Sequence, residues 1–287
     1  MQLHTAEFRF TLLTPCFGGT ALGKHDDHAE MRVPPMRGHI RFWHRALFGP
    51  ADANRVWGST SGDEGQGSRV ALRIRNSSLR GQYLADILPH DLKKSGKPRP
   101  SLREGAEFSL QLQRLVGCTN GDWDHAQRAV KLWLLLGCLG LRSNRAAGSV
   151  WPFGDWVPND PVSLKTTIEN LGLSNWSVAL VGYGQGKAVI ELRKTASDTI
   201  AGAPHRPVFG GINDREPSPT KFKVAMLAAQ AGQIPAPCLL AVAPRLQIQG
   251  HGGIRRTILQ EAEHLLWNVK PTPTRWRDLG AWNHLIS

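Results

Sequence analysis

The sequence has no long hydrophobic run, which argues against a membrane-spanning helix. No stretch of 18 or more apolar residues occurs among the 287 residues, so we expect no transmembrane helix. The first ten residues contain His4, Glu7 and Arg9 and have no apolar central region, so we also expect no signal peptide. These features favour a cytoplasmic protein that has no membrane partner.

Cysteine is scarce and widely spaced. The four cysteines are Cys16, Cys118, Cys138 and Cys238. Because no C-x-x-C spacing occurs, the sequence argues against a zinc ribbon and against a disulfide scaffold, and it fits a reducing compartment. The histidines and aspartates of residues 25–28 have the types of side chain that bind metals, but no further ligands follow at a metal-binding spacing. We interpret this segment as a polar loop and predict neither a metal site nor a cofactor.

Acidic residues are few compared with basic ones. The chain has 35 Lys and Arg against 23 Asp and Glu, which gives a formal net charge of +12 and an isoelectric point near 10.1. A charge excess of this size is typical of proteins that bind a polyanion such as RNA, DNA or an anionic membrane, although it also serves solubility. The hydrophobic fraction of 41% is enough for a packed core, in one large domain or two of ordinary size.

Two common nucleotide-binding signatures are also missing. There is no Walker A loop, and no aromatic signature of the usual RNA-recognition motif. What does occur is a small loop at 140–149, flanked by glycine, which contains Arg142 and Arg145. Because few bulky side chains stand in its way, the backbone of such a loop can approach phosphate groups closely.

The segment Pro34–Gly49 is the most distinctive stretch. Its apolar residues Met36, Ile40, Trp43 and Leu47 follow helical spacing and predict one buried helix face. Its arginines recur at every fourth position, roughly 100° around the helix from the apolar face; they are Arg37, Arg41 and Arg45. Gly49-Pro50 is expected to end the helix. The basic edge is either solvated or a binding surface.

The order of predicted elements favours an α+β fold. In the first half we expect strands over 8–13, 69–75 and 108–113 and a helix over 125–139 that is capped by Asp122 or Asp124. In the second half we expect a helix over 163–171 with Ser163 as N-cap, strands over 178–183, 188–192, 221–224 and 238–246, a final helix over 254–269, and a tail packed on the body or on a partner. The strand–helix–strand–strand–helix order of the first half is typical of a ferredoxin-like unit.

Three stretches together resemble the RAMP superfamily of CRISPR–Cas proteins. The first is a Thr-Pro strand end and a Gly-Gly pair followed by P-x-M-R-G-x-I-R-F-W-x-R, and the second is the V-W-G-S of residues 56–59. The third is the arginine loop after a long helix, with S-P-T-K-F-K-V at 218–224. The arginine helix resembles most closely that of subunit one of the type III-B Cmr effector complex. The loop departs from the family pattern, since it has Ala146-Ala147 where the family has more glycine.

The resemblance implies two ferredoxin-like domains, which we place at 1–155 and 156–287. It also implies a non-catalytic subunit that assembles with other RAMP subunits on a crRNA guide, near the guide's 3′ end, in antiviral defence, with target RNA as a further candidate partner. The positions that match the family's basic residues and the late lysine strand are Arg37, Arg41, Arg45, Arg142, Arg145, Lys221 and Lys223. Arginine suits this role because its planar fork of donors binds phosphate oxygens without selecting a base sequence.

Other hypotheses remain open from the sequence. A RAMP endoribonuclease that processes CRISPR precursor RNA would need a general base and a general acid. The candidate histidines in the first half are His4, His25, His28, His39 and His44. An unrelated basic module for DNA or ribosomal RNA would explain the charge but not the arginine helix. Trp43 could stack on a base, although its place in the apolar stripe favours core packing.

Overall fold

The computed structural model describes ten parts of the chain: residues 4–18, 28–60, 65–78, 82–85, 98–174, 176–184, 221–244, 247–249, 255–257 and 283–286. Within these ranges no helix is both long and apolar enough to cross a bilayer. The helices and strands are, in order, β1 (Thr5–Leu12), α1 (Val33–Trp57), β2 (Val70–Ser78), β3 (Gln82–Ala85), β4 (Arg99–Leu102), β5 (Glu107–Arg114), α2 (Asn120–Leu136), β6 (Val150–Pro152), α3 (Pro161–Asn170), β7 (Trp176–Tyr183), β8 (Lys221–Leu227), β9 (Ala236–Pro244), β10 (Gln247–Gln249), β11 (Arg255–Thr257) and β12 (Asn283–Ile286).

The first sheet is antiparallel and has the strand order β2-β5-β1-β6. Along β1, Phe8, Phe10 and Leu12 are buried while the residues between them are more exposed, as the alternation predicts. Phe10 pairs with Phe108 of β5, and their stacked rings have centroids 5.5 Å apart. Since α1 connects β1 to β2 and α2 connects β5 to β6, the connectivity is the βαββαβ order of a ferredoxin-like unit, with the β3–β4 hairpin inserted before β5.

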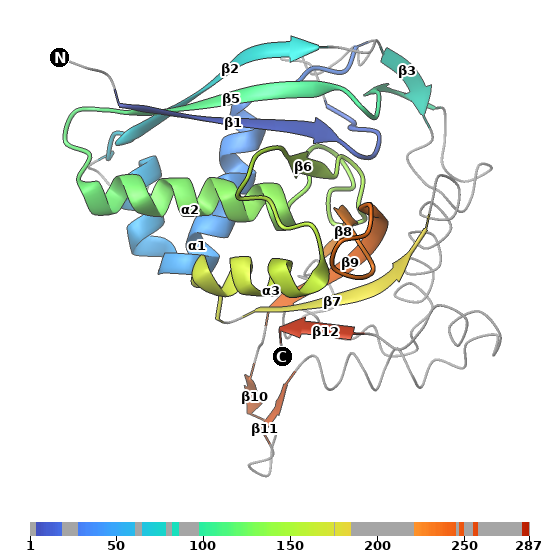
Figure 1. The fold of residues 1–287 in the computed structure, drawn as a ribbon. Helices are drawn as coiled ribbons and strands as arrows, with labels where there is room; N and C mark the ends of the chain where they lie inside the picture. Colours follow the sequence, from blue (N-terminus) through green and yellow to red (C-terminus); the bar gives the residue numbers. More distant parts are fainter. Residues whose placement is uncertain are drawn as a thin grey trace.

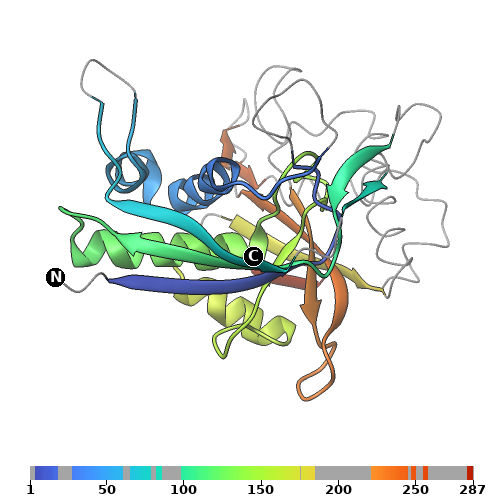
Figure 2. The ribbon, with the colours of Figure 1, turned by 90° about the horizontal axis from the view of Figure 1, so that it is seen from above.

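Both long helices cover the same face of this sheet. Figure 1 shows α1 and α2 beneath β1 and β5, and in Figure 2 the strands lie in front of α2. The helix α2 begins at N-cap Thr119, so the predicted cap at Asp122 or Asp124 is wrong. Asp122 is instead the third residue of a capping box: its side chain accepts from the Thr119 amide at 2.9 Å, and its amide donates to Thr119 Oγ1 at 3.1 Å.

The helix α1 continues past the position where the sequence predicts its end. The chain breaks helical geometry at Gly49, with φ 84° and ψ 171°, but Pro50 then opens a second helical segment that ends at Trp57. Proline suits the first turn of a helix, because its missing N–H has no partner there anyway. Met36, Ile40 and Trp43 are at most 1% exposed, which confirms the apolar stripe and the core position of Trp43.

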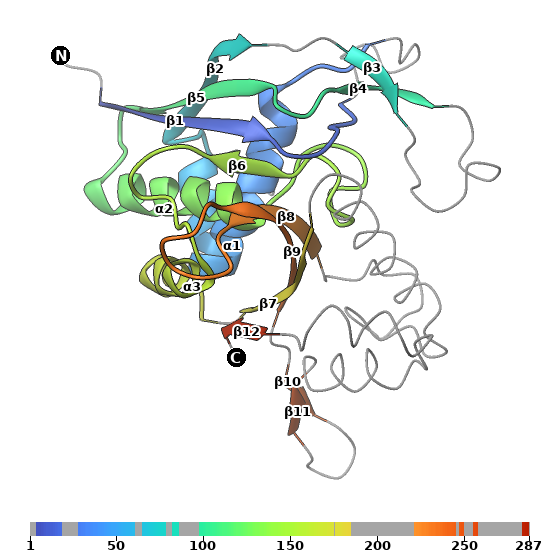
Figure 3. The ribbon, with the colours of Figure 1, turned by 45° about the vertical axis from the view of Figure 1, so that its right-hand side comes forward.

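The second sheet has the order β12-β7-β9-β8, and it is also antiparallel. Figure 3 shows it below the first sheet, near α3. The helix α3 is capped by Asp160, whose carboxylate accepts from the amides of Val162 and Ser163; the predicted N-cap, Ser163, is the third helical residue. Ile168 of α3 and Val178 of β7 belong to the same buried cluster as Phe10, so a single hydrophobic core extends through both sheets.

The mixed helix and antiparallel-sheet fold is thus confirmed, and the division at residue 155 stays a prediction. The expected helix over 254–269 is wrong at Arg255–Thr257, which form β11 and pair with β10; the rest of that range lies outside the described residues. The strand predicted over 188–192 also lies outside them. From the tail, β12 pairs with β7, so this part packs on the body of the molecule as expected.

Candidate nucleic-acid interface

The seven cationic residues predicted to bind RNA do not form one surface. The structure places them in three locations: a stripe along α1, a cluster where α1 meets the 140–149 loop and β8, and an enclosed position beneath the end of α2. The stripe contains Arg37, Arg41 and Arg45, the cluster contains Arg142, Arg145 and Lys221, and the enclosed position holds Lys223. Each location has a different chemical environment.

The arginine stripe lies against the second helical segment of α1. The cross-segment hydrogen bonds join Arg37 to the carbonyl oxygen of Trp57, Arg41 to Asn54 Oδ1, and His44 to Asp52. Residues later in the first segment bond residues earlier in the second segment. The two segments therefore run antiparallel and form a helical hairpin about Gly49. We call residues 33–57 the α1 hairpin. Two of the three arginines therefore have structural partners.

The charge of the stripe is not neutralised within the hairpin. Burial, followed by the nearby charges of Arg45 and Arg37, lowers the pKa of Arg41. Arg41 Nε is buried without a hydrogen-bond partner. Arg45 is exposed and has no ion pair with any described side chain. Of the three, only Arg45 has no hydrogen bond or ion pair with a described residue, so its guanidinium is the most available to an outside ligand.

A second group of cations gathers around Lys221, the first residue of β8. Lys221 Nζ donates to Asn144 Oδ1 at 2.6 Å and lies 4.5 Å from the centroid of the Phe42 ring. Burial, and then the Lys221 charge, lowers the pKa of His39 to about 4. We call this group the junction cluster, and its members are His39, Phe42, Arg142, Asn144, Arg145 and Lys221.

The α1 residues of the junction cluster lie on a different side of the helix from Arg41. Each residue advances a helix by about 100°, so Phe42 lies about 100° around α1 from Arg41 and His39 lies about 160° away. The sequence predicted these cations as RNA-binding residues without placing them relative to one another. They occupy two sides of α1, because the helix passes between the hairpin segment on one side and β8 on the other.

The 140–149 loop keeps a tight conformation although it is poor in glycine. Arg142 and Ala146 adopt left-handed backbone angles, with φ of 60° and 61°. Gly148 also has a positive φ, and a Cβ atom there would lie 1.9 Å from the carbonyl oxygen of Leu139, so no other residue fits. The loop thus exposes Arg142 and leaves Arg145 half-buried, while its Gly148 end is packed.

Arg145 in this loop has an unused donor. Phe222 N donates to the carbonyl oxygen of Asn144 at 3.1 Å, which ties the loop to β8. Arg145 Nη1 is buried and has no hydrogen-bond partner in the described part of the chain. Burial, followed by the charge of Arg142, lowers the pKa of Arg145. No described carboxylate pairs with Arg142, Arg145 or Lys221. An anionic ligand would supply the missing acceptor and the missing negative charge.

Lys223 lies where no ligand can reach it, so its assignment to the RNA-binding set is wrong. Its side chain is 0% exposed, and its ammonium donates to the carbonyl oxygens of Leu134 at 2.9 Å, Gly137 at 2.5 Å, and Val150. Helix ends leave such carbonyls without intrahelical partners, so Lys223 caps the C-terminus of α2. Burial lowers the pKa of Lys223 to about 7. The sequence pattern could not show that β8 lies beside this helix end.

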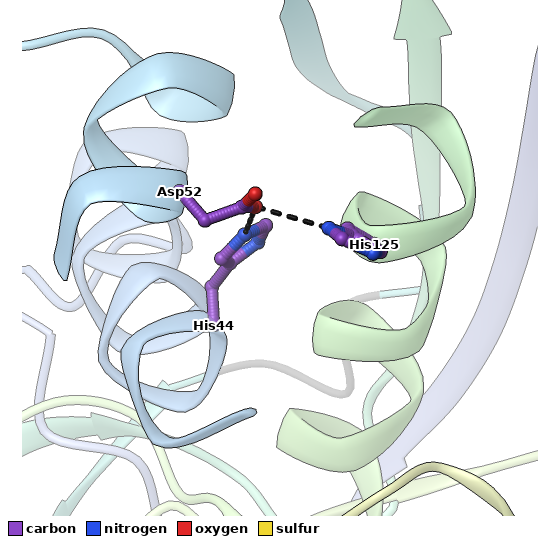
Figure 4. A group of neighbouring side chains, drawn as sticks. All are labelled: His44, Asp52 and His125. Atoms are coloured by element: carbon purple, nitrogen blue, oxygen red, sulfur yellow. Dashed lines mark hydrogen bonds and ion pairs between the residues drawn. The ribbon is translucent and has the colours of Figure 1, made fainter. Parts of the chain in front are cut away.

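The sequence did not identify a His–Asp–His group that joins the α1 hairpin to α2. Figure 4 shows Asp52 Oδ1 accepting from His44 Nε2 at 2.8 Å and from His125 Nδ1 at 3.1 Å. The three atoms lie within 4.8 Å of one another, which is a spacing that a metal ion could use. However, the Trp57 indole N–H donates to His44 Nδ1 at 2.9 Å. Because indole can only donate, His44 carries its proton on Nε2, where a metal would need the lone pair. The group is therefore a hydrogen-bond network.

This network continues to the start of α2. Arg55 bonds both Asp52 and Asp122, and Arg69 donates to Asp122 at 2.8 Å. Burial alone would raise the pKa of Asp122, but the hydrogen bonds from the Thr119 amide, Arg69 and Arg55 outweigh it and hold that pKa well below its ordinary value. The α1 hairpin is therefore fixed to α2 by charge-assisted hydrogen bonds, and Arg69, the residue before β2, bonds the same carboxylate of α2.

The candidate catalytic histidines have different environments. His44 is 0% exposed and both of its ring nitrogens are bonded, so no substrate can use it as an acid or a base. His39 is half-buried in the junction cluster, His4 and His28 are exposed, and His25 lies outside the described residues.

Comparison with known proteins gives a family and a fold. Residues 9–151 match the model of the RAMP superfamily. None of the curated proteins compared matches the chain. The crystal structure of Cmr1 from Pyrococcus furiosus (apo form) is similar over 99% of both chains, with 15% identity and a TM-score of 0.63. A chain of the type III-B Cmr-beta complex, bound to cognate target RNA and AMPPnP in the presence of ssDNA, is similar over 93% of this chain and 98% of its own length, with 10% identity and a TM-score of 0.51. At these identities the likeness shows a shared fold.

Proposed function

Because this chain belongs to the RAMP superfamily through residues 9–151, we propose that it is a non-catalytic, crRNA-binding assembly subunit of a type III-B CRISPR effector complex. In this role it lies near the 3′ end of the guide, contacts companion RAMP subunits and contributes to antiviral defence. The observation that carries the proposal is the likeness of fold to Cmr1 over 99% of both chains.

The distribution of charge supports an RNA partner. The chain has a formal net charge of +12. Arg45 on the hairpin, and Arg142, Arg145 and Lys221 in the junction cluster, are cations without a described carboxylate beside them. Such groups bind a phosphate backbone whatever its base sequence, which suits a guide whose sequence varies.

The proposal extends to the second half of the chain. We assign residues 156–287 to a second ferredoxin-like RAMP domain, which follows the first at 1–155. Its support is the four-stranded antiparallel sheet β12-β7-β9-β8, which has the same number of strands as the first sheet.

Affinity purification of the tagged chain from its native host, with sequencing of the bound RNA, tests the proposal. We expect short guides of uniform length together with companion RAMP subunits. Recovery of ribosomal RNA or DNA alone would instead support an unrelated basic binding module.

A metal-independent RAMP endoribonuclease is the second candidate, and one observation favours it. Asp52 accepts the Nδ1 proton of His125, whose side chain is 28% exposed, so the other ring nitrogen of His125 is left for proton transfer. Purified protein incubated with repeat RNA and a chelator should leave the RNA intact. Cleavage at one site that is lost in His125→Ala but retained in His4→Ala would replace our proposal with this one.

A further inference from the structure

Phe42 is a large apolar side chain that the core does not enclose. It is 38% exposed, whereas its helix neighbour Trp43 is 1% exposed. The rings of Trp43 and Trp176 meet that of Phe42 nearly at right angles, with centroids 5.3 Å and 5.7 Å away. The Phe42 ring is therefore held in a fixed orientation while the residue stays partly exposed.

The surroundings of this exposed ring are cationic. Lys221 lies over the ring and is held by Asn144, which belongs to the same loop as Arg145. The buried Nη1 atom of Arg145 has no acceptor. These groups come from three elements that are far apart in the sequence, and each contributes something a nucleotide needs: an aromatic surface, a positioned cation or an unused N–H donor.

Proteins that hold single-stranded nucleic acid combine cations for the phosphate backbone with an aromatic ring for the base, and the junction cluster has both kinds of group. We propose that Phe42 stacks on an unpaired RNA base while Arg145 and Lys221 bind the adjoining phosphate. The assignment rests on the proposed function, because it takes RNA as the ligand. In this assignment the junction cluster is a subsite for an unpaired nucleotide. The bases of duplex RNA are paired and stacked, so they would not contact the Phe42 ring.

The geometry favours a nucleotide over an acidic protein segment at this site. A carboxylate would neutralise Lys221, but it would leave the Phe42 ring without a flat partner. A base offers a π-face of the right shape, and its phosphate offers several acceptor oxygens for Arg145.

The test measures the affinity of the purified full-length chain for two labelled 12-nucleotide RNAs, an oligouridine and the same strand with abasic nucleotides. Base stacking on an aromatic ring is typically worth about tenfold or more in affinity. We expect wild type to prefer the oligouridine by about that factor. Phe42→Leu, which keeps an apolar side chain against the two tryptophans, should lose this preference, and Phe42→Trp should keep it.

Phe153→Leu is the matched control. Phe153 is also an exposed phenylalanine, at 40%, with a cation 5.7 Å over its ring, but it lies beside Arg9 of β1. Its replacement should leave both affinities unchanged.

Three results would overturn the inference. If Phe42→Leu lowers the affinity for both RNAs equally, Phe42 only shapes the site. If Phe42→Leu changes neither affinity while Lys221→Ala lowers both, the cluster binds phosphate and makes no contact with a base. If it releases companion subunits and leaves RNA affinity intact, the ring docks on protein. Failure of wild type to bind either RNA would instead contradict the proposed function itself.

Discussion

Two lysines on β8, two residues apart, show how far the environment of a residue can depart from its sequence pattern. Lys221 and Lys223 fall on the same side of an alternating strand, and both were predicted to bind RNA. Lys221 lies at the junction cluster, whereas Lys223 lies beneath the end of α2 with its ammonium bound to backbone carbonyls. The alternation of side chains along the strand was predictable. The elements that pack against each lysine were not, because they come from distant parts of the chain.

The same substitution should therefore affect stability at one lysine and RNA binding at the other. Lys223→Met leaves buried carbonyls unbonded and should lower the free energy of unfolding by about 2–4 kcal/mol. Lys221→Met should change that free energy by less than about 1 kcal/mol and weaken RNA binding. Urea denaturation and RNA titration of both variants measure the difference, and equal effects on stability would show that Lys223 does not cap α2.

His39 and His44 make stability depend on pH. Burial is the largest cause that lowers both pKa values below the ordinary 6.5, to about 4 for His39. Below pH 6.5 the unfolded chain therefore takes up protons that the folded chain does not, and stability is lost as the pH falls. Each histidine should lower the free energy of unfolding by up to about 1.4 kcal/mol for each pH unit in this range.

Urea denaturation between pH 7 and pH 4.5 measures this loss. Replacement of His39 by glutamine should make the dependence on pH shallower. A slope identical to that of wild type would mean that His39 is protonated in the folded state.

The α1 hairpin is the element that sequence reasoning recovered only in part. Helical spacing gave the buried stripe, the arginine stripe and the break at Gly49-Pro50. It could not give the second segment's return along the first, because that path depends on the backbone angle at Gly49 and on bonds such as Arg41 to Asn54. Part of the arginine stripe that seemed free for a ligand is thus used to close the hairpin.

A pair of glycine substitutions tests the hairpin. Gly38 and Gly49 both have open space where a Cβ would be, but only Gly49 has a positive φ. Gly49→Ala should destabilise the protein by about 1–3 kcal/mol, because its φ and ψ lie in a region that only glycine occupies readily. Gly38→Ala should stabilise it by about 0.5–1 kcal/mol, because alanine favours a helix. Thermal unfolding distinguishes these two signs, and a stabilising Gly49→Ala would contradict the hairpin geometry.

At the scale of the whole molecule, net charge predicted a polyanionic partner but not where it binds. The fold class followed from the order of strands and helices, and the βαββαβ unit is present in the first half. The candidate site was predicted as a list of cations. Its real division into two sides of α1 arises from the packing of β8 and the 140–149 loop against that helix, and no local pattern contains that information.

The salt dependence of RNA binding should report this division. For single-stranded RNA the slope of log affinity against log salt falls by about 0.7 for each phosphate contact that is lost. Arg45→Ala and Arg142→Ala should each reduce the slope by about that amount, since both side chains are exposed. Arg37→Ala should chiefly lower the melting temperature, since its guanidinium bonds Trp57. An unchanged slope in both variants would mean that Arg45 and Arg142 are solvated and make no phosphate contact.

The enclosed position of Lys223 also affects how the chain is made. Its ammonium reaches back 73 residues to the carbonyl of Val150, so the end of α2 and strand β6 emerge from the ribosome well before their donor exists. At the usual rates of synthesis that interval is roughly 4–15 s. During this time the carbonyl groups that later bond Lys223 can bond only water. The hydrogen bonding of this helix end is therefore complete only after β8 has been translated.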